Sequence, residues 1–270
     1  MKIGIFDSGL GGLTIFKSIH QHLPCYDYVY LGDNARAPYG SRSFEAILKF
    51  TTEAVQYLFG RDCCLIIIAC NTASAKALRT IQQRVLPATF PARRVLGVLR
   101  PSVEELGRRT KTNTVALWAT EGTVRSLSFE IEMKKLAPEL HLVQHACPLL
   151  VPLVEAGELD GPGVEYFVRK YWRETEQRAS NIDTLLLACT HYPLLLPLIR
   201  AVLPQQVKIL VQGHFVAPSC KDYLRRHPEI EEKLSRNRTA HFLTTDRNES
   251  FDHLAQIFLG VPVSSERVEL

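Results

Sequence analysis

Short apolar runs alternate with longer amphipathic segments along most of this chain, and this alternation constrains its fold more than any other feature. The runs are rich in valine, isoleucine and leucine, as is typical of strands that are buried on both faces of a parallel sheet. They lie at residues 2–6, 65–69, 95–99, 115–119 and 183–188, with one more strand expected at 208–211. Strands that alternate with helices predict an α/β fold with mostly parallel sheets flanked by helices.

The segments between these runs carry the 3.6-residue period of helices. Apolar side chains recur at that spacing within residues 44–58, 77–85, 164–175, 194–202 and 251–259. Gly260 directly follows the last of these segments, where a glycine commonly ends a helix. The sequence therefore predicts helices between most of the strands.

Two of the apolar runs end in the same dipeptide, alanine followed by cysteine, at Cys70 and Cys189. The similarity extends upstream, because the strand at 2–6 leads into a polar turn at Asp7 and the strand at 115–119 into one at Thr120. We therefore predict two similar α/β domains related by a pseudo-twofold axis, with the active site between them. The first would comprise residues 1–98 plus about 207–270, and the second residues 99–206.

The composition excludes several classes of protein. The net charge is only +4 over 270 residues and no run of lysine and arginine occurs, so we expect no nucleic-acid partner. No apolar stretch is long enough to cross a bilayer, and the chain starts with a strand pattern, so we expect neither a membrane partner nor a signal peptide. Seven cysteines, several of them in apolar runs, indicate a reduced, cytoplasmic protein.

The sequence also argues against two kinds of bound group. The glycine-rich turn at residues 7–12 matches neither dinucleotide-binding nor P-loop patterns, and Asp7 at its start would repel phosphate. No CxxC pair is present, so no metal site is expected. The need for a tight turn is sufficient to explain the glycines at residues 11 and 12.

Both cysteines are expected at the carboxyl ends of strands, where parallel sheets bind ligands. A lone cysteine there is more often a packing residue, and Cys189 with His191 could also form a nucleophile and its base. Two cysteines in matched polar settings favour acid–base chemistry on opposite faces of one carbon. One thiolate would remove a proton while the opposite thiol delivers another, which inverts the configuration. A helix after each cysteine would support the thiolate with its positive end.

Several segments resemble the motifs of the glutamate racemases of the aspartate/glutamate racemase family. These segments are residues 6–14, 30–40, 69–75, 147–157 and 189–193. They cover the chain from its first residues to about 200, in the order that the family has. The resemblance implies an isomerase that interconverts L- and D-glutamate without a cofactor and supplies D-glutamate for peptidoglycan, the polymer of the bacterial cell wall. It also implies a homodimer.

The resemblance implies roles for individual residues as well. Cys70 and Cys189 correspond to the proton donor and acceptor, and Asp7 to the acid beside the first cysteine and the substrate ammonium group. His191 corresponds to the residue that assists Cys189, and Glu155 to the acid that supports this histidine. The substrate contacts would be Ser8, Pro38, Tyr39, Gly40, Asn71, Thr72, Thr120, Thr123 and Thr190.

Some positions depart from the family pattern. Arg100 and Ser102 stand where glutamate and glycine are usual, Ala188 replaces a glycine, and Val211-Gln212 replaces Asp-Ser. None of these changes removes a proton-transfer group. Two other readings stay open: a racemase for aspartate or another amino acid, and a catalytically weak protein that kept the fold for binding or inhibition.

Overall fold

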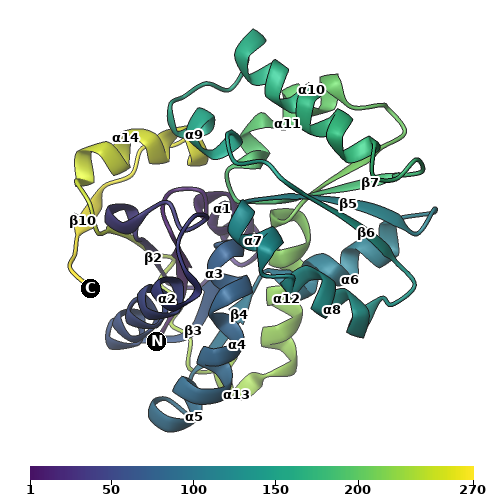
Figure 1. Cartoon of the computed structure of the whole chain (residues 1–270). Coiled ribbons are helices and arrows are strands. Elements are labelled where there is room, and N and C mark those ends of the chain that lie inside the picture. The colour runs from purple at the N-terminus through teal and green to yellow at the C-terminus, as the bar shows by residue number, and fades with distance from the viewer. The chain divides into compact units, whose positions relative to one another are not determined.

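The computed structural model describes all 270 residues, which divide into two compact units. The first unit contains Met1–Val98 and Gly213–Leu270, and the second contains Leu99–Gln212. Each unit has its own parallel sheet with helices beside it, as Figure 1 shows. The predicted α/β class is confirmed.

The sheet of the first unit has six parallel strands in the order β10-β9-β2-β1-β3-β4. The strands are β1 (Lys2–Asp7), β2 (Tyr28–Gly32), β3 (Cys63–Ile68), β4 (Arg94–Gly97), β9 (Ala240–Thr244) and β10 (Ser265–Arg267). Every residue of β2 and β3 is buried, as expected for inner strands covered on both faces. The central strand β1 pairs with β2 on one side and β3 on the other.

Local chemistry marks the start of α2 and the end of α14 among the helices of the first unit. They are α1 (Leu13–His22), η1 (Asn34–Arg36), α2 (Phe44–Gly60), α3 (Asn71–Lys76), α4 (Leu78–Thr80), η2 (Ile81–Val85), α5 (Leu86–Thr89), α12 (Gly213–Arg226), α13 (Pro228–Glu231) and α14 (Asn248–Leu259). The Ser43 hydroxyl caps α2 by accepting the Ala46 N–H at 3.2 Å. Gly260 ends α14 with a left-handed φ of 78°, as predicted.

The sheet of the second unit has four parallel strands in the order β6-β5-β7-β8. They are β5 (Thr114–Ala119), β6 (His141–Ala146), β7 (Thr184–Ala188) and β8 (Lys208–Val211). The strand predicted at 208–211 is therefore present, but it pairs with β7 in the second sheet. The chain returns to the first unit at Gly213 rather than near residue 207.

Seven helices lie beside the second sheet. They are α6 (Leu99–Arg109), α7 (Glu121–Arg125), α8 (Ser128–Leu136), α9 (Leu150–Glu155), α10 (Pro162–Glu176), η3 (Tyr192–Leu195) and α11 (Leu196–Val202). Buried Trp118 of β5 donates its indole N–H to the Thr175 hydroxyl of α10 at 3.0 Å, which ties this helix to the central strand. No helix in either unit combines the length and the apolar character needed to cross a bilayer.

Four strands were not predicted from the apolar runs. β6 alternates buried and more exposed residues, β9 is buried only at its last two residues, and β10 has only three residues, so none of them forms a continuous apolar run. β2 is rich in tyrosine, lies between β1 and β9, and is buried at every residue. The helix expected over 77–85 is divided, since α4 passes into the π-helical turn η2.

Candidate active site

The two cysteines occupy matching places in the two sheets. In the first unit, Phe6 of the central strand β1 pairs with Ile68 of β3, and Cys70 follows two residues later. In the second unit, Ala119 of the central strand β5 pairs with Ala188 of β7, and Cys189 follows directly. The repeat seen in the sequence is thus also a repeat in topology. Cys70 follows β3, which pairs with β1, and Cys189 follows β7, which pairs with β5.

Cys70 has polar neighbours that can stabilise a thiolate. It is the N-terminal cap of α3, and its Sγ accepts the Ala73 N–H at 3.5 Å. The Sγ also lies 3.4 Å from the Ser8 hydroxyl, which follows β1. A thiolate gains from N–H and O–H donors at the start of a helix. The predicted helix after this cysteine is therefore present, and Ser8 lies next to the sulfur.

Asp7 is the last residue of β1 and is fully buried. Its Oδ2 accepts the Gly9 N–H at 3.0 Å, so the turn after the strand folds around the carboxylate. At Gly12 an added Cβ would lie 2.4 Å from the Asp7 Cβ, so only glycine fits there. Gly12 thus makes room for Asp7.

Tyr30 of β2 lies close to Asp7 and Cys70. Burial raises the pKa of Tyr30 well above its ordinary value, and the charges of Asp7 and Cys70 raise it further. The tyrosine therefore stays protonated, and its hydroxyl donates to the Gly9 carbonyl at 2.8 Å.

The segment at residues 38–40 was predicted to contact the substrate. Pro38 is exposed, Gly40 is partly exposed, and the side chain of Tyr39 is buried. The Tyr39 hydroxyl donates to the carboxylate of Asp33, so this side chain is used inside the unit. A ligand would meet the backbone of the segment.

Asp33 is the buried acid that the sequence analysis did not select. It directly follows β2, and its N–H donates to the Asp7 carbonyl at 3.0 Å. The signal that could have identified it is its place after a strand that ends beside Asp7. That signal was lost because the strand at 28–32 was not predicted.

In the second unit, Cys189, His191 and Glu155 form a chain of polar contacts. The Cys189 Sγ lies 3.9 Å from the His191 Nδ1, and the His191 Nε2 lies 3.1 Å from the Glu155 Oε1. His191 is buried, whereas the side chain of Glu155 is 40% exposed. Burial alone would lower the pKa of His191, but the contacts with Cys189 and Glu155 outweigh it and raise the pKa to about 10. An imidazolium at neutral pH follows.

The positive group beside Cys189 is therefore the histidine and not a helix end. The expected α-helix does not start at this cysteine, because the 3-10 helix η3 begins at Tyr192 and α11 only at Leu196. The Cys189 sulfur lies beside the His191 ring, whereas the Cys70 sulfur accepts a backbone N–H. The two cysteines are in chemically different settings.

Three predicted threonines lie near the strand ends of the second unit. Thr120 caps α7 and its hydroxyl lies 3.1 Å from that of buried Thr123. Thr190, which stands between Cys189 and His191 in the sequence, is buried. In the first unit, Asn71 and Thr72 follow Cys70 and are likewise buried. Thr120 has a structural role as a helix cap, because its hydroxyl oxygen accepts the Thr123 N–H. The same hydroxyl group can also donate a hydrogen bond to a ligand.

The remaining cysteines are suited to packing. Burial raises the pKa of Cys63 and of Cys220 to about 12. Burial, with the charge of Cys189 second, also raises the pKa of Cys147 well above its ordinary value. These thiols stay protonated at neutral pH, which is typical of structural cysteines.

Three of the residues that depart from the family pattern have polar partners in the structure. The Arg100 guanidinium pairs with Glu104 at 3.2 Å on the exposed side of α6. Ser102 and Gln212 are both buried, and the Gln212 Nε2 donates to the Ser102 hydroxyl at 2.8 Å. Two unusual residues thus satisfy each other. Ala188 is a fully buried residue at the end of β7.

Known proteins share this fold and sequence over nearly the whole chain. The sequence model of the Asp/Glu/Hydantoin racemase family matches residues 4–214. Glutamate racemase from Geobacter metallireducens is 38% identical, with 96% of this chain and 92% of the relative covered. The crystal structure of glutamate racemase isoform RacE1 from Bacillus anthracis matches with a TM-score of 0.90 at 33% identity, covering 100% of this chain and 97% of that one.

A second solved structure, glutamate racemase from Francisella tularensis in complex with D-glutamate, matches with a TM-score of 0.87 at 31% identity. It covers 99% of this chain and 97% of its own. The family model spans most of the sequence, and the relatives match in both units. The chain therefore belongs to the Asp/Glu/Hydantoin racemase family and is an amino-acid racemase, an isomerase.

Proposed function

We propose that this racemase interconverts L-glutamate and D-glutamate, with Cys70 and Cys189 as the two proton-transfer groups. The observation that carries the proposal is the matching place of the two cysteines, each after the strand beside the centre of a parallel sheet. The similar proteins described above support glutamate as the substrate, since each is a glutamate racemase and one is in complex with D-glutamate.

The proposed reaction moves two protons and no other atoms. One cysteine thiolate removes the Cα proton, so that the C–H bond breaks, an S–H bond forms, and the electron pair stays on a carbanion stabilised by the substrate carboxylate. The opposite thiol then gives its proton to the other face of Cα, which becomes inverted. Each turnover leaves the two sulfurs with exchanged protonation states, and the reverse reaction starts from that state. The proposal requires that both thiols reach the same Cα.

The neighbours of each sulfur fit such a role. The imidazolium of His191 stabilises a thiolate at Cys189, and Glu155 orients the histidine through Nε2. The Ala73 N–H donates to the Cys70 Sγ, and the Ser8 hydroxyl, which accepts from the Cys70 thiol, would donate to it once this sulfur is a thiolate. A thiol is otherwise protonated at neutral pH, with an ordinary pKa of about 8.5, so this support is needed for the base.

The remaining residues of the site would bind the zwitterionic substrate. The carboxylate of Asp7 suits the ammonium group, and donors on Ser8, Asn71 and Thr72 suit one carboxylate. Hydroxyls of Thr120, Thr123 and Thr190 in the second unit and the backbone of Pro38, Tyr39 and Gly40 in the first would complete the contacts. Directed donors that hold the developing negative charge lower the barrier to proton removal.

We further propose that the enzyme needs no cofactor, acts in the cytoplasm as a homodimer, and supplies D-glutamate for peptidoglycan. Activity that persists in the presence of chelators and carbonyl reagents would support the first point. Growth of a D-glutamate auxotroph that carries this chain would support the last. Failure of an active, expressed enzyme to restore growth would contradict the cell-wall role.

The central test is the change in circular dichroism of L-glutamate incubated with the purified protein. Cys70→Ser and Cys189→Ser should each lower kcat by at least about a thousandfold, because a serine hydroxyl is far too weakly acidic to exchange protons as a thiol does. Cys25→Ser, at a partly exposed cysteine, is the control and should keep full activity. Full activity of either site variant would contradict the two-thiol mechanism.

Deuterium exchange at Cα in D2O separates proton removal from racemisation. The same assay with L-aspartate and other amino acids decides substrate preference. Turnover of L-aspartate with a higher kcat/KM than L-glutamate would replace the proposed substrate while keeping the mechanism.

A further inference from the structure

Asp33 is a fully buried carboxylate to which the proposed mechanism gives no proton to carry. It follows β2 directly, next to the end of the central strand, where its N–H donates to the Asp7 carbonyl at 3.0 Å. A buried carboxylate is costly unless several donors compensate for lost water. We therefore ask which residues compensate for the burial of Asp33 and what they hold in place.

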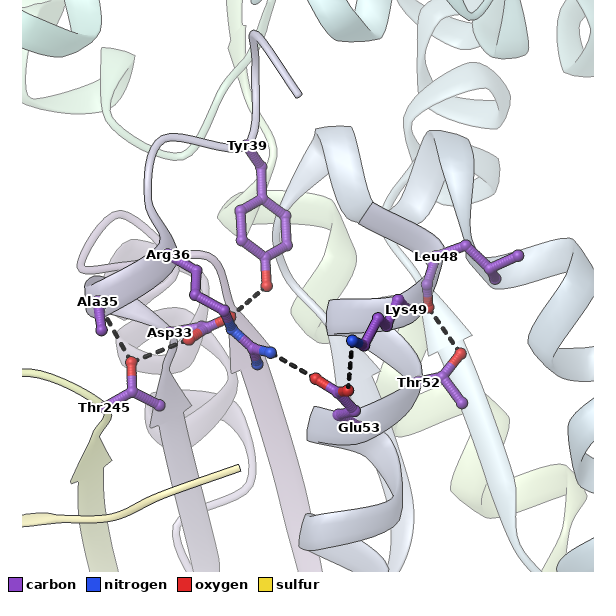
Figure 2. A network of polar contacts seen from close by, with 9 residues as sticks. All are labelled: Asp33, Ala35, Arg36, Tyr39, Leu48, Lys49, Thr52, Glu53 and Thr245. Carbon is purple, nitrogen blue, oxygen red and sulfur yellow. Dashed lines mark hydrogen bonds and ion pairs between the residues drawn. The ribbon is translucent and has the colours of Figure 1, made fainter. Parts of the chain in front are cut away.

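Three side chains donate to this carboxylate, as Figure 2 shows. The Tyr39 hydroxyl and the Arg36 Nε, at 2.6 Å, both reach Oδ2. The Thr245 hydroxyl reaches Oδ1 at 2.9 Å. Burial and the charge of Asp33 raise the pKa of Tyr39 far above its ordinary value, so the phenol keeps the proton that it donates.

Thr245 joins a remote part of the sequence to this cluster. It follows β9, and its N–H donates to the Gly32 carbonyl at 3.1 Å. Its hydroxyl also accepts the Ala35 N–H at 3.0 Å while donating to Asp33. One hydroxyl thus links the start of η1 to the carboxylate.

Arg36 extends the cluster to α2. Its Nη1 donates to the Glu53 carboxylate, and its guanidinium lies 4.3 Å from the centre of the Phe50 ring. Glu53 is also 3.9 Å from the Lys49 ammonium group, as Figure 2 shows. The guanidinium is therefore held from both ends, with Asp33 on one side and Glu53 on the other.

Two of the residues that donate to Asp33 lie beside or within the segment at 37–40. Arg36 precedes this segment and Tyr39 lies within it, and both bond to the same carboxylate oxygen. The turn before them is closely packed, since an added Cβ at Gly32 would lie 2.5 Å from the Gly9 carbonyl oxygen. The backbone of 37–40 has little freedom while all three bonds are made.

We propose that Asp33 is a positioning residue: through Tyr39, Arg36 and Thr245 it fixes the backbone of residues 37–40 in the conformation that binds the substrate. This inference rests on the proposed function, in which that backbone contacts glutamate. Asp33 itself exchanges no proton with the substrate. Its loss loosens substrate binding and leaves the proton-transfer groups in place.

A second buried aspartate, at the other end of β2, provides a matched control. Asp27 precedes β2 at its other end, is 1% exposed, and accepts bonds from Asn237 Nδ2 at 2.6 Å and from the Thr239 N–H and hydroxyl at 2.9 Å. It too links β2 to the chain beside β9. It lies at the amino end of the parallel sheet, away from the residues that follow the strands at the carboxyl end.

The test compares Asp33→Asn with Asp27→Asn in the full-length protein. We expect Asp33→Asn to raise the KM for both glutamate enantiomers by about tenfold with kcat within about threefold of the wild type, which is the pattern of lost substrate positioning. Asp27→Asn should lower the thermal midpoint and leave KM unchanged. Equal KM effects of the two variants, or a loss confined to kcat in Asp33→Asn, would overturn the inference.

A milder pair keeps the test decisive if Asp33→Asn does not fold. Thr245→Val removes the hydroxyl and keeps the shape, and it should raise KM by about threefold, whereas Thr245→Ser should restore the wild-type KM. Equal KM values for valine, serine and the wild type would refute the inference alone. A wild-type protein that turns over no glutamate would instead refute the proposed function, and this inference with it.

Discussion

Glu155→Gln offers a direct test of the chain that links Glu155, His191 and Cys189. The change removes one negative charge and keeps the size and shape of the side chain. The carboxylate lies 3.1 Å from the His191 Nε2, so it stabilises the imidazolium form of the ring. The variant therefore weakens the positive charge that supports the Cys189 thiolate.

The size of the effect follows from the distance and the exposure. Two unit charges at this distance attract by about 1.3 kcal/mol in bulk water and by about 5 kcal/mol at an effective dielectric constant of about 20. Glu155 is 40% exposed, so water screens the pair and the smaller value applies. About 1.4 kcal/mol corresponds to one pKa unit. We expect the pKa of His191 to fall by about one unit from its value of about 10.

The assay is the pH dependence of racemisation, followed by circular dichroism from pH 6 to 11. Because the histidine pKa is raised, the imidazolium is present at neutral pH and is lost as the pH rises through that value. The alkaline limb of kcat/KM should lie near pH 10 in the wild type and about one unit lower in Glu155→Gln. Since enantiomers have equal free energies, kcat/KM must be the same in both directions, which checks the data internally.

The control is Glu165→Gln, which removes a carboxylate of equal 40% exposure that pairs with Arg169 on α10. It should leave the alkaline limb in place. An unchanged limb in Glu155→Gln, or an equal shift in both variants, would refute the reasoning that Glu155 acts through His191.

Three further predictions concern stability and packing. Asp27→Asn should lower the free energy of unfolding by about 2 kcal/mol near neutral pH, as measured by urea denaturation. Burial would raise the pKa of Asp27, but its hydrogen bonds outweigh burial and lower it, so the contribution is present above the ordinary value of about 4 and is lost as the pH falls below it. The difference between variant and wild type should shrink in acid, and a constant difference would contradict this origin. Gly12→Ala should reduce kcat/KM by about a hundredfold by displacing Asp7, whereas Gly107→Ala, where an added Cβ finds its nearest contact at 3.7 Å, should keep activity. Gly260→Ala should cost about 1 kcal/mol in unfolding free energy, because alanine disfavours the φ of 78° that ends α14, with kcat and KM unchanged; an unaltered denaturation midpoint would argue against strain at this helix end.

The local pattern of the chain was sufficient for the fold class. Runs such as 65–69 and 183–188 are buried on both faces, so their composition alone identifies inner parallel strands. The repeated Ala-Cys ending also placed both cysteines correctly, because the end of a parallel strand is fixed once the strand is known. Strands β6 and β9 escaped prediction because each is short and only partly buried, so neither forms a continuous apolar run.

The chemical setting of each cysteine was harder to predict than its position. A helix after Cys189 was expected from the apolar spacing of 194–202, yet the 3-10 helix η3 comes first and His191 provides the positive charge. The spacing of apolar residues reports which face of a helix is buried. It does not report where the first turn begins, which depends on the packing of Tyr192 and Pro193 at the strand end.

The sequence by itself determined the α/β class and the repeated strand-to-cysteine unit, because each depends on residues close together in the chain. Only the tertiary structure decided that 208–211 joins the second sheet, that Ser102 and Gln212 bond to each other, and that Asp33 accepts the Thr245 hydroxyl. These contacts join residues far apart in sequence, and a buried polar group takes whichever partner the packing of the whole unit brings within hydrogen-bonding distance.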